Sequence, residues 1–168
     1  MNPPEAPSPR ARALRWLARR EHSRAELERK LLREVHPEDD AARQAVHAAL
    51  DDLAARGLLS DERAAESLVA ARASRYGSLR LRQALQSRGL TPELVDSALQ
   101  SANVAASELD RARAIWQRKF GQPAPAGHEG ARERARQTRF LAGRGFAPAV
   151  IRQVLRCSGP DEGDPADE

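Results

Sequence analysis

The chain has 168 residues, of which 28 are lysine or arginine and 24 are aspartate or glutamate, so its formal net charge is +4. No apolar run approaches the ~20 residues that a transmembrane helix needs, and the proline-rich first ten residues lack the pattern of a signal peptide. Cys157 is the only cysteine, which excludes an internal disulfide and a thiolate metal site. We therefore expect a soluble, cytoplasmic protein with no membrane association.

The positive charge is concentrated in one part of the chain. Six of the acidic residues lie near the termini, so residues 10–158 carry ten more basic than acidic side chains. Residues 111–156 alone contain eleven arginines and lysines but only two glutamates. This excess predicts a basic surface that faces nucleic acid, or a protein bound to nucleic acid. The alternative to a basic binding surface is that the arginines only keep the helix surfaces in contact with solvent.

Alanine, leucine, arginine and glutamate fill the chain, and runs of β-branched residues are absent, so the predicted fold class is all-α. A first helix is expected from about residue 11 to residue 20. Ser23 and Glu26 then form a capping box that starts the next helix. A third helix is expected over about 40–56, and these three helices make one compact unit.

A second unit begins at Ser60 or Asp61, either of which can cap a helix that runs to about residue 75. Gly77 and Ser78 interrupt it, and a short helix is expected over 79–88.

A tight corner follows, because Gly89 can adopt the left-handed conformation at the helix end. Thr91 can cap the next helix, and Pro92 suits its first position. In the third unit we expect helices over about 105–120, 131–143 and 148–156.

The sequence of this corner occurs twice in the chain. Residues 81–99 align with residues 137–155, and the alignment pairs Arg88 with Arg144, Gly89 with Gly145 and Pro92 with Pro148. The repetition predicts an elongated array of three tandem three-helix repeats, each resembling a helix-turn-helix unit. The predicted domains are a disordered proline-rich head at 1–10, repeats at 11–59, 60–103 and 104–157, the third with a long loop at 121–130, and a disordered acidic tail at 158–168.

Three segments together resemble the RecX family of bacterial recombination regulators. They read LARREHSRAELERKL (17–31), LAARGLLSDERAAESLVAARASRYGSLRLRQALQSRGL (53–90) and RFLAGRGFAPAVIRQVL (139–155). The resemblance covers roughly residues 11–156. It implies a non-enzymatic regulator in recombination, DNA repair and the SOS response that binds the RecA recombinase filament in its groove. Such a protein would mainly inhibit the ATPase, strand-exchange and coprotease activities of RecA.

The resemblance also implies that DNA is met mainly within the filament, with weak direct binding, and that the protein is a monomer with no cofactor. Family members usually carry aromatic residues where this chain has Ala64, Ala65 and Leu68, so the interface or the local packing is expected to differ there.

The positions that we interpret as architectural are caps and turns: Asp61, Gly77, Gly89, Thr91, Pro92, Gly145 and Pro148. The basic positions are the better candidates for contact with the RecA filament or DNA: Arg72, Arg75, Arg80, Arg82, Arg88, Lys119, Arg132, Arg136, Arg139 and Arg144. Three of them, Arg132, Arg136 and Arg139, recur at helical spacing and share one face, which makes them the strongest contact hypothesis.

No catalytic or metal-binding constellation is present in the sequence. The four histidines lie in different segments without ligand spacing, and the glycines are scattered at helix ends. Trp16 and Trp116 are expected in the core. Two other functions stay open: a direct DNA-binding protein with tandem helix-turn-helix units, and a helical adaptor with no nucleic acid nearby.

Overall fold

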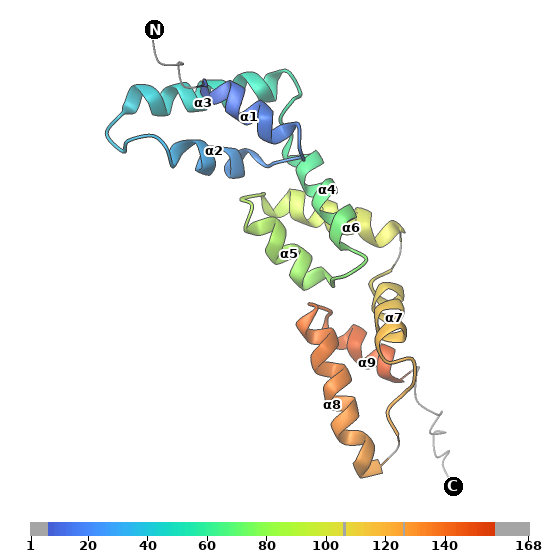
Figure 1. Cartoon of the computed structure of the whole chain (residues 1–168). Coiled ribbons are helices and arrows are strands. Elements are labelled where there is room, and N and C mark those ends of the chain that lie inside the picture. Colours follow the sequence, from blue (N-terminus) through green and yellow to red (C-terminus); the bar gives the residue numbers. More distant parts are fainter. Residues whose placement is uncertain (1–6, 106, 126, 157–168) are drawn as a thin grey trace. The chain divides into compact units, whose positions relative to one another are not determined.

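A computed structural model of the chain describes residues 7–105, 107–125 and 127–156 (Figure 1). These residues form nine α-helices and contain no strand, which confirms the all-α prediction. The acidic tail and Cys157 lie outside the described residues, as does most of the proline-rich head. The helices are α1 (Pro9–Leu17), α2 (Arg24–Leu32), α3 (Asp40–Ala55), α4 (Asp61–Arg72), α5 (Ser78–Gln86), α6 (Pro92–Ala105), α7 (Glu108–Lys119), α8 (Gly127–Gly143) and α9 (Pro148–Arg156).

Two helices begin at least two residues earlier than the sequence predicts. Helix α1 begins at Pro9, because the Ser8 hydroxyl caps it and proline suits its first position. Helix α8 begins at Gly127 and takes in the end of the segment 121–130 that was expected to be a loop. The Arg134 guanidinium donates hydrogen bonds to the carbonyl oxygens of Pro125 (2.7 Å) and Gly127 (3.0 Å), which ties the start of α8 to the segment before it.

The described chain forms two compact units. Of the described residues, the first comprises 7–69 and 84–98, and the second comprises 70–83, 99–105, 107–125 and 127–156. In the first unit α1, α2 and α3 lie together and contact one another (Figure 1). Their core includes Leu27, Leu31 and Leu50, and Trp16 packs at its edge. In the second unit α7, α8 and α9 enclose a core that includes Trp116 and Phe146. Both tryptophans thus contact cores, as predicted.

Within the first unit, the N-terminus of α2 binds the corner between α5 and α6. The Ser23 hydroxyl caps α2 and also donates a hydrogen bond to the carbonyl oxygen of Arg88 (2.6 Å). Arg29, one turn along α2, donates to the carbonyl oxygen of Ser87 (3.0 Å). The start of α2 therefore binds two carbonyl groups of the turn that follows α5.

Within the second unit, the N-terminus of α5 binds the corner between α8 and α9 in the same manner. The amide of Gly77 donates to the carbonyl oxygen of Arg144 (2.9 Å), and the amide of Leu79 donates to that of Gly145 (3.1 Å). Arg88 and Arg144 are the residues that the alignment of the two corners pairs. The repeated sequence therefore encodes a repeated contact between the start of one helix and the corner after another, which we call a joint.

A carboxylate completes each joint. Asp61, the first residue of α4, accepts a hydrogen bond from the amide of Arg24, the first residue of α2 (2.7 Å). Glu108, the first residue of α7, accepts one from the amide of Ser78, the first residue of α5 (2.9 Å). An anionic group at a helix N-terminus is stabilised by the exposed amides and the helix dipole. Each joint thus binds a carbonyl and a carboxylate at one helix start.

The two joints need glycine in the corner. Gly89 and Gly145 have φ values of +75° and +81°, which side chains of L-amino acids rarely adopt. A Cβ atom on Gly89 would lie 2.5 Å from the Cβ of Ala25, and one on Gly145 would lie 2.5 Å from the Cβ of Arg80. Both conformation and close approach therefore restrict these positions to glycine.

We predict that Gly145→Ala lowers the free energy of unfolding by about 1 to 3 kcal/mol, because it strains the backbone and pushes the corner away from α5. The matched control is Gly143→Ala, two residues earlier, where an added Cβ meets nothing within 4 Å. That control should be neutral or gain roughly 0.5 to 1 kcal/mol in helix stability. Urea unfolding of both variants measures the difference, and equal destabilisation would contradict the joint.

Candidate functional site

Three of the predicted contact arginines make hydrogen bonds or ion pairs at the joints. The Arg80 guanidinium donates to the carbonyl oxygen of Gly143 (2.8 Å) and lies over the Tyr76 ring, 4.9 Å from its centroid. The Arg88 guanidinium lies 3.7 Å from the carboxylate of Glu26. Arg144 donates to the carbonyl oxygen of Arg75 (3.0 Å). These residues have a structural role whether or not a partner also touches them.

The arginine row predicted on α8 is exposed along its whole length. Arg132, Arg136 and Arg139 all have exposed side chains. Arg136 pairs with Glu133 at 3.1 Å and lies over the Phe120 ring, 5.4 Å from its centroid, which fixes its direction. Among the other predicted contact residues, Arg72, Arg75 and Lys119 are exposed and Arg82 is half-buried.

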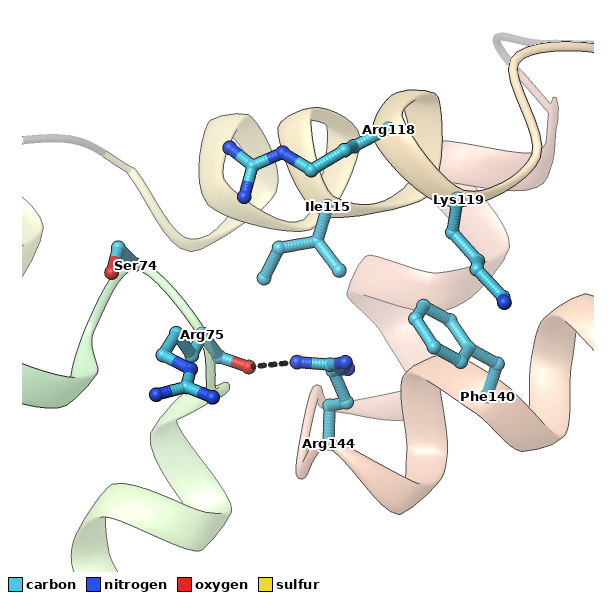
Figure 2. Close-up of a pocket in the computed structure, with 7 residues that line it drawn as sticks. All are labelled: Ser74, Arg75, Ile115, Arg118, Lys119, Phe140 and Arg144. Atoms are coloured by element: carbon cyan, nitrogen blue, oxygen red, sulfur yellow. Dashed lines mark hydrogen bonds between the residues drawn. The ribbon is translucent and has the colours of Figure 1, made fainter.

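Four basic residues surround a pocket of about 290 Å³ in the second unit (Figure 2). Figure 2 shows that the lining comes from three segments: the connection between α4 and α5, helix α7, and the C-terminal part of α8 with the turn after it. None of the lining residues is acidic. They are Ser74, Arg75, Ile115, Arg118, Lys119, Phe140 and Arg144.

Arg144 is held in place at this pocket. Its guanidinium lies over the Phe140 ring, 4.8 Å from the centroid, and donates the hydrogen bond to the Arg75 carbonyl that Figure 2 marks. Phe140 is itself fixed by an edge-to-face contact with Phe120, at a centroid distance of 5.3 Å. The pocket therefore has a positive group whose orientation is set before any ligand arrives.

A second pocket, of about 280 Å³, lies in the first unit beside the α2 joint. Its lining includes Glu26 among the basic residues Arg29, Lys30, Arg33 and Arg88. The Glu26 carboxylate also pairs with Arg20 at 3.1 Å. Because this pocket contains its own carboxylate, it is a weaker anion site than the pocket in the second unit.

Sequence reasoning did not single out Glu108 or Arg118. Glu108 could have been found from its position after Ser107, since Asp61 likewise follows Ser60 at the start of a helix. The sequence left open whether Ser60 or Asp61 caps α4. The structure shows that the Ser60 hydroxyl caps α4, whereas the Asp61 carboxylate accepts a hydrogen bond from the amide of Arg24 at the start of α2. Arg118 carries no local signal, because only the fold brings it to Arg144.

The proline and threonine positions of the corners lie where the sequence places them. Pro92 is the first residue of α6, and Pro148 is the first residue of α9. The Thr91 hydroxyl accepts a long hydrogen bond from the amide of Leu94 (3.5 Å).

In the described part of the chain, no group of acidic, histidine and cysteine residues could hold a metal ion. No helix there is long and apolar enough to cross a membrane.

His22 is buried at the joint of the first unit, with 3% of its surface exposed. Burial lowers the pKa of its imidazole to about 4, and the positive charges of Arg20 and Lys30 act in the same direction. Glu26 opposes them, with its carboxylate 3.8 Å from the His22 Nδ1 atom. Burial raises the pKa of Glu26, but hydrogen bonds from Arg20 and Ser23 and the charge of Arg88 lower it below its ordinary value.

Comparison with known proteins identifies the family. Models of the first, second and third three-helix domains of RecX match residues 10–43, 60–99 and 106–155, in that order. Regulatory protein RecX of Leptothrix cholodnii is 52% identical, over 88% of this chain and 87% of that protein. Regulatory protein RecX of Ralstonia nicotianae is 46% identical, over 92% of both chains. The chain belongs to the RecX family.

Solved RecX structures have the same fold. A crystal structure of regulatory protein RecX matches with a TM-score of 0.67 at 21% identity, over 87% of this chain and 70% of that chain. The structure of RecX from Lactobacillus salivarius matches with a TM-score of 0.69 at 17% identity, over 88% of this chain and 92% of that chain. RecX proteins are regulators rather than enzymes, so the predicted non-enzymatic class and the three tandem three-helix domains are confirmed.

For this RecX chain we predict that the free energy of unfolding falls as the pH drops from about 6.5 to 4. The unfolded state takes up a proton on His22 in that range, whereas the folded state does so only near pH 4. The loss reaches about 3 kcal/mol below pH 4. Glu26 adds to the loss only at lower pH, since its pKa lies below its ordinary value of 4.5.

Urea unfolding at a series of pH values measures this loss in the wild type and in two variants. His22→Gln should flatten the curve between pH 6.5 and 4. His128→Gln, whose parent side chain is exposed, should leave the curve unchanged. An unaltered slope in His22→Gln would assign the pH dependence to other groups.

Proposed function

We propose that this RecX chain binds the RecA recombinase filament along its groove and inhibits the ATPase, strand-exchange and coprotease activities of RecA. The observation that carries the proposal is the presence of all three RecX domains in family order, together with high identity to regulatory RecX proteins. The basic surface of the third domain also supports it, since the DNA in such a filament is a polyanion.

The proposal includes the repeat bounds at 11–59, 60–103 and 104–157. We propose the exposed arginines of α8 as the main contact and the joint arginines as residues that set the positions of the domains. The glycines and caps act indirectly, by fixing the corners. The proposed location is cytoplasmic, where RecA acts on DNA, and the protein is proposed to act as a monomer.

Direct DNA binding is the second candidate function. The pocket of the second unit favours it, because four cationic side chains and no acidic one line it. Binding to DNA alone would then fall steeply with salt concentration, whether or not RecA is present. An adaptor that works away from nucleic acid would bind neither DNA nor the filament tightly.

The test is ATP hydrolysis by a preformed RecA filament on single-stranded DNA, titrated with this protein. We expect inhibition at fewer than one protein per RecA subunit. Charge reversal by Arg132→Glu with Arg139→Glu should raise the concentration for half inhibition by roughly tenfold, equivalent to about 1.4 kcal/mol of binding free energy.

The matched control is Arg152→Glu with Arg156→Glu, which changes the net charge equally on exposed positions of α9 in the same unit. This control should inhibit nearly as well as the wild type. Equal loss in both double variants would show that only total charge matters, and unimpaired inhibition by the α8 variant would remove the arginine row from the interface.

A further inference from the structure

We infer that the pocket between the α4–α5 connection, α7 and α8 binds a backbone phosphate of a DNA strand. This inference deepens the proposed function, because it names the DNA of the filament as what this surface touches. It rests on the proposed function only for the statement that this DNA is the DNA of the RecA filament. The DNA contact itself is measured without RecA.

The chemistry of the lining points to a phosphate. Arg75, Arg118, Lys119 and Arg144 bring four cations to one opening, with no carboxylate among the lining residues to neutralise them. Guanidinium groups bind phosphate oxygens through paired hydrogen bonds, and an ammonium group adds a point charge. The pocket of the first unit provides the contrast, since its cations already face Glu26.

The pocket is preorganised for this ligand. Arg144 is oriented by the Arg75 carbonyl and the Phe140 ring, so little side-chain freedom is lost when it binds. Ile115 and Phe140 give the wall an apolar part, which suits the sugar that follows each phosphate in a strand.

The spacing along α8 favours a strand over a small anion. Arg132, Arg136 and Phe140 follow one another at intervals of four residues on one face of α8, and Arg144 follows in the turn after the helix ends at Gly143. Four residues of helix rise by about 6 Å. This face of α8 therefore carries two cations before it reaches the pocket at Phe140, where four more cations gather. Such an arrangement suits a ligand with a charge on every unit, and a nucleic acid strand is such a ligand.

The lining also joins two domains of the second unit. Ser74 and Arg75 precede α5 in the second RecX domain, whereas α7 and α8 belong to the third. A phosphate held between Arg75 and the α7 cations would therefore stabilise the joint that Gly77 makes with Arg144. Binding of DNA and docking of these two domains are thus coupled.

The experiment measures binding of a fluorescein-labelled single-stranded oligonucleotide by anisotropy over a series of salt concentrations. The test variant is Arg118→Gln with Lys119→Gln, because both side chains are exposed and neither takes part in the joint hydrogen bonds described above. The plot of log affinity against log salt should become shallower by roughly 0.7 for each cation that contacts a phosphate. Arg152→Gln with Arg156→Gln is the control of equal charge, and it should keep the wild-type slope.

A shallower slope in the pocket variant alone supports the inference. An unchanged slope in that variant overturns it, and so does an equal change in both variants, because diffuse charge would then explain the binding. Loss of RecA inhibition with unchanged DNA binding also overturns it, since the occupant would then be an acidic surface of a protein. If the wild type binds DNA through the pocket but leaves RecA unaffected, the proposed function fails and the phosphate site stands.

Discussion

The arrangement of this chain depends on hydrogen bonds between the start of one helix and the corner that ends another. In the first unit the N-terminus of α2 binds the carbonyl oxygen of Arg88, and in the second unit the N-terminus of α5 binds that of Arg144. Each bond pairs a donor at the start of one helix with an acceptor in the corner after another, where an unpaired buried polar group would be costly. The positive N-terminal end of one helix dipole also meets the negative C-terminal end of another there, which is favourable.

The joints divide the middle domain between the two units. The boundary of the units falls within α4, α5 and α6, so the start of α5 belongs with the third domain and its end with the first. Small three-helix domains bury little apolar surface by themselves, and neighbours in a repeat protein supply the remainder. A substitution in a corner such as Gly145 is therefore expected to weaken two domains together rather than one.

The sequence predicted most of the helices and both corners, because helix caps, prolines and left-handed glycines act on residues that are close to them in the sequence. The partners of those corners were not predictable in the same way. Ser23 was recognised as a cap from Glu26, but its bond to Arg88 joins residues 65 positions apart. Arg118 was missed for the same reason, since it acquires its role only when the fold brings Arg144 to it, whereas Glu108 was missed although its position after Ser107 is a local signal.

The distinction between structural and binding arginines follows from the same geometry. Arg80 and Arg144 resembled contact residues in the sequence, yet both donate to backbone carbonyls across the joint. An arginine that is fixed at a joint can still present its remaining donors to a ligand, because a guanidinium group has five. Arg144 combines the two roles, since the bond to Arg75 that holds the domains together also orients the cation at the pocket. For this chain, a surface that recognises a polyanion and a joint that positions the domains can therefore share one residue, and partner binding would act directly on the bond that connects the domains.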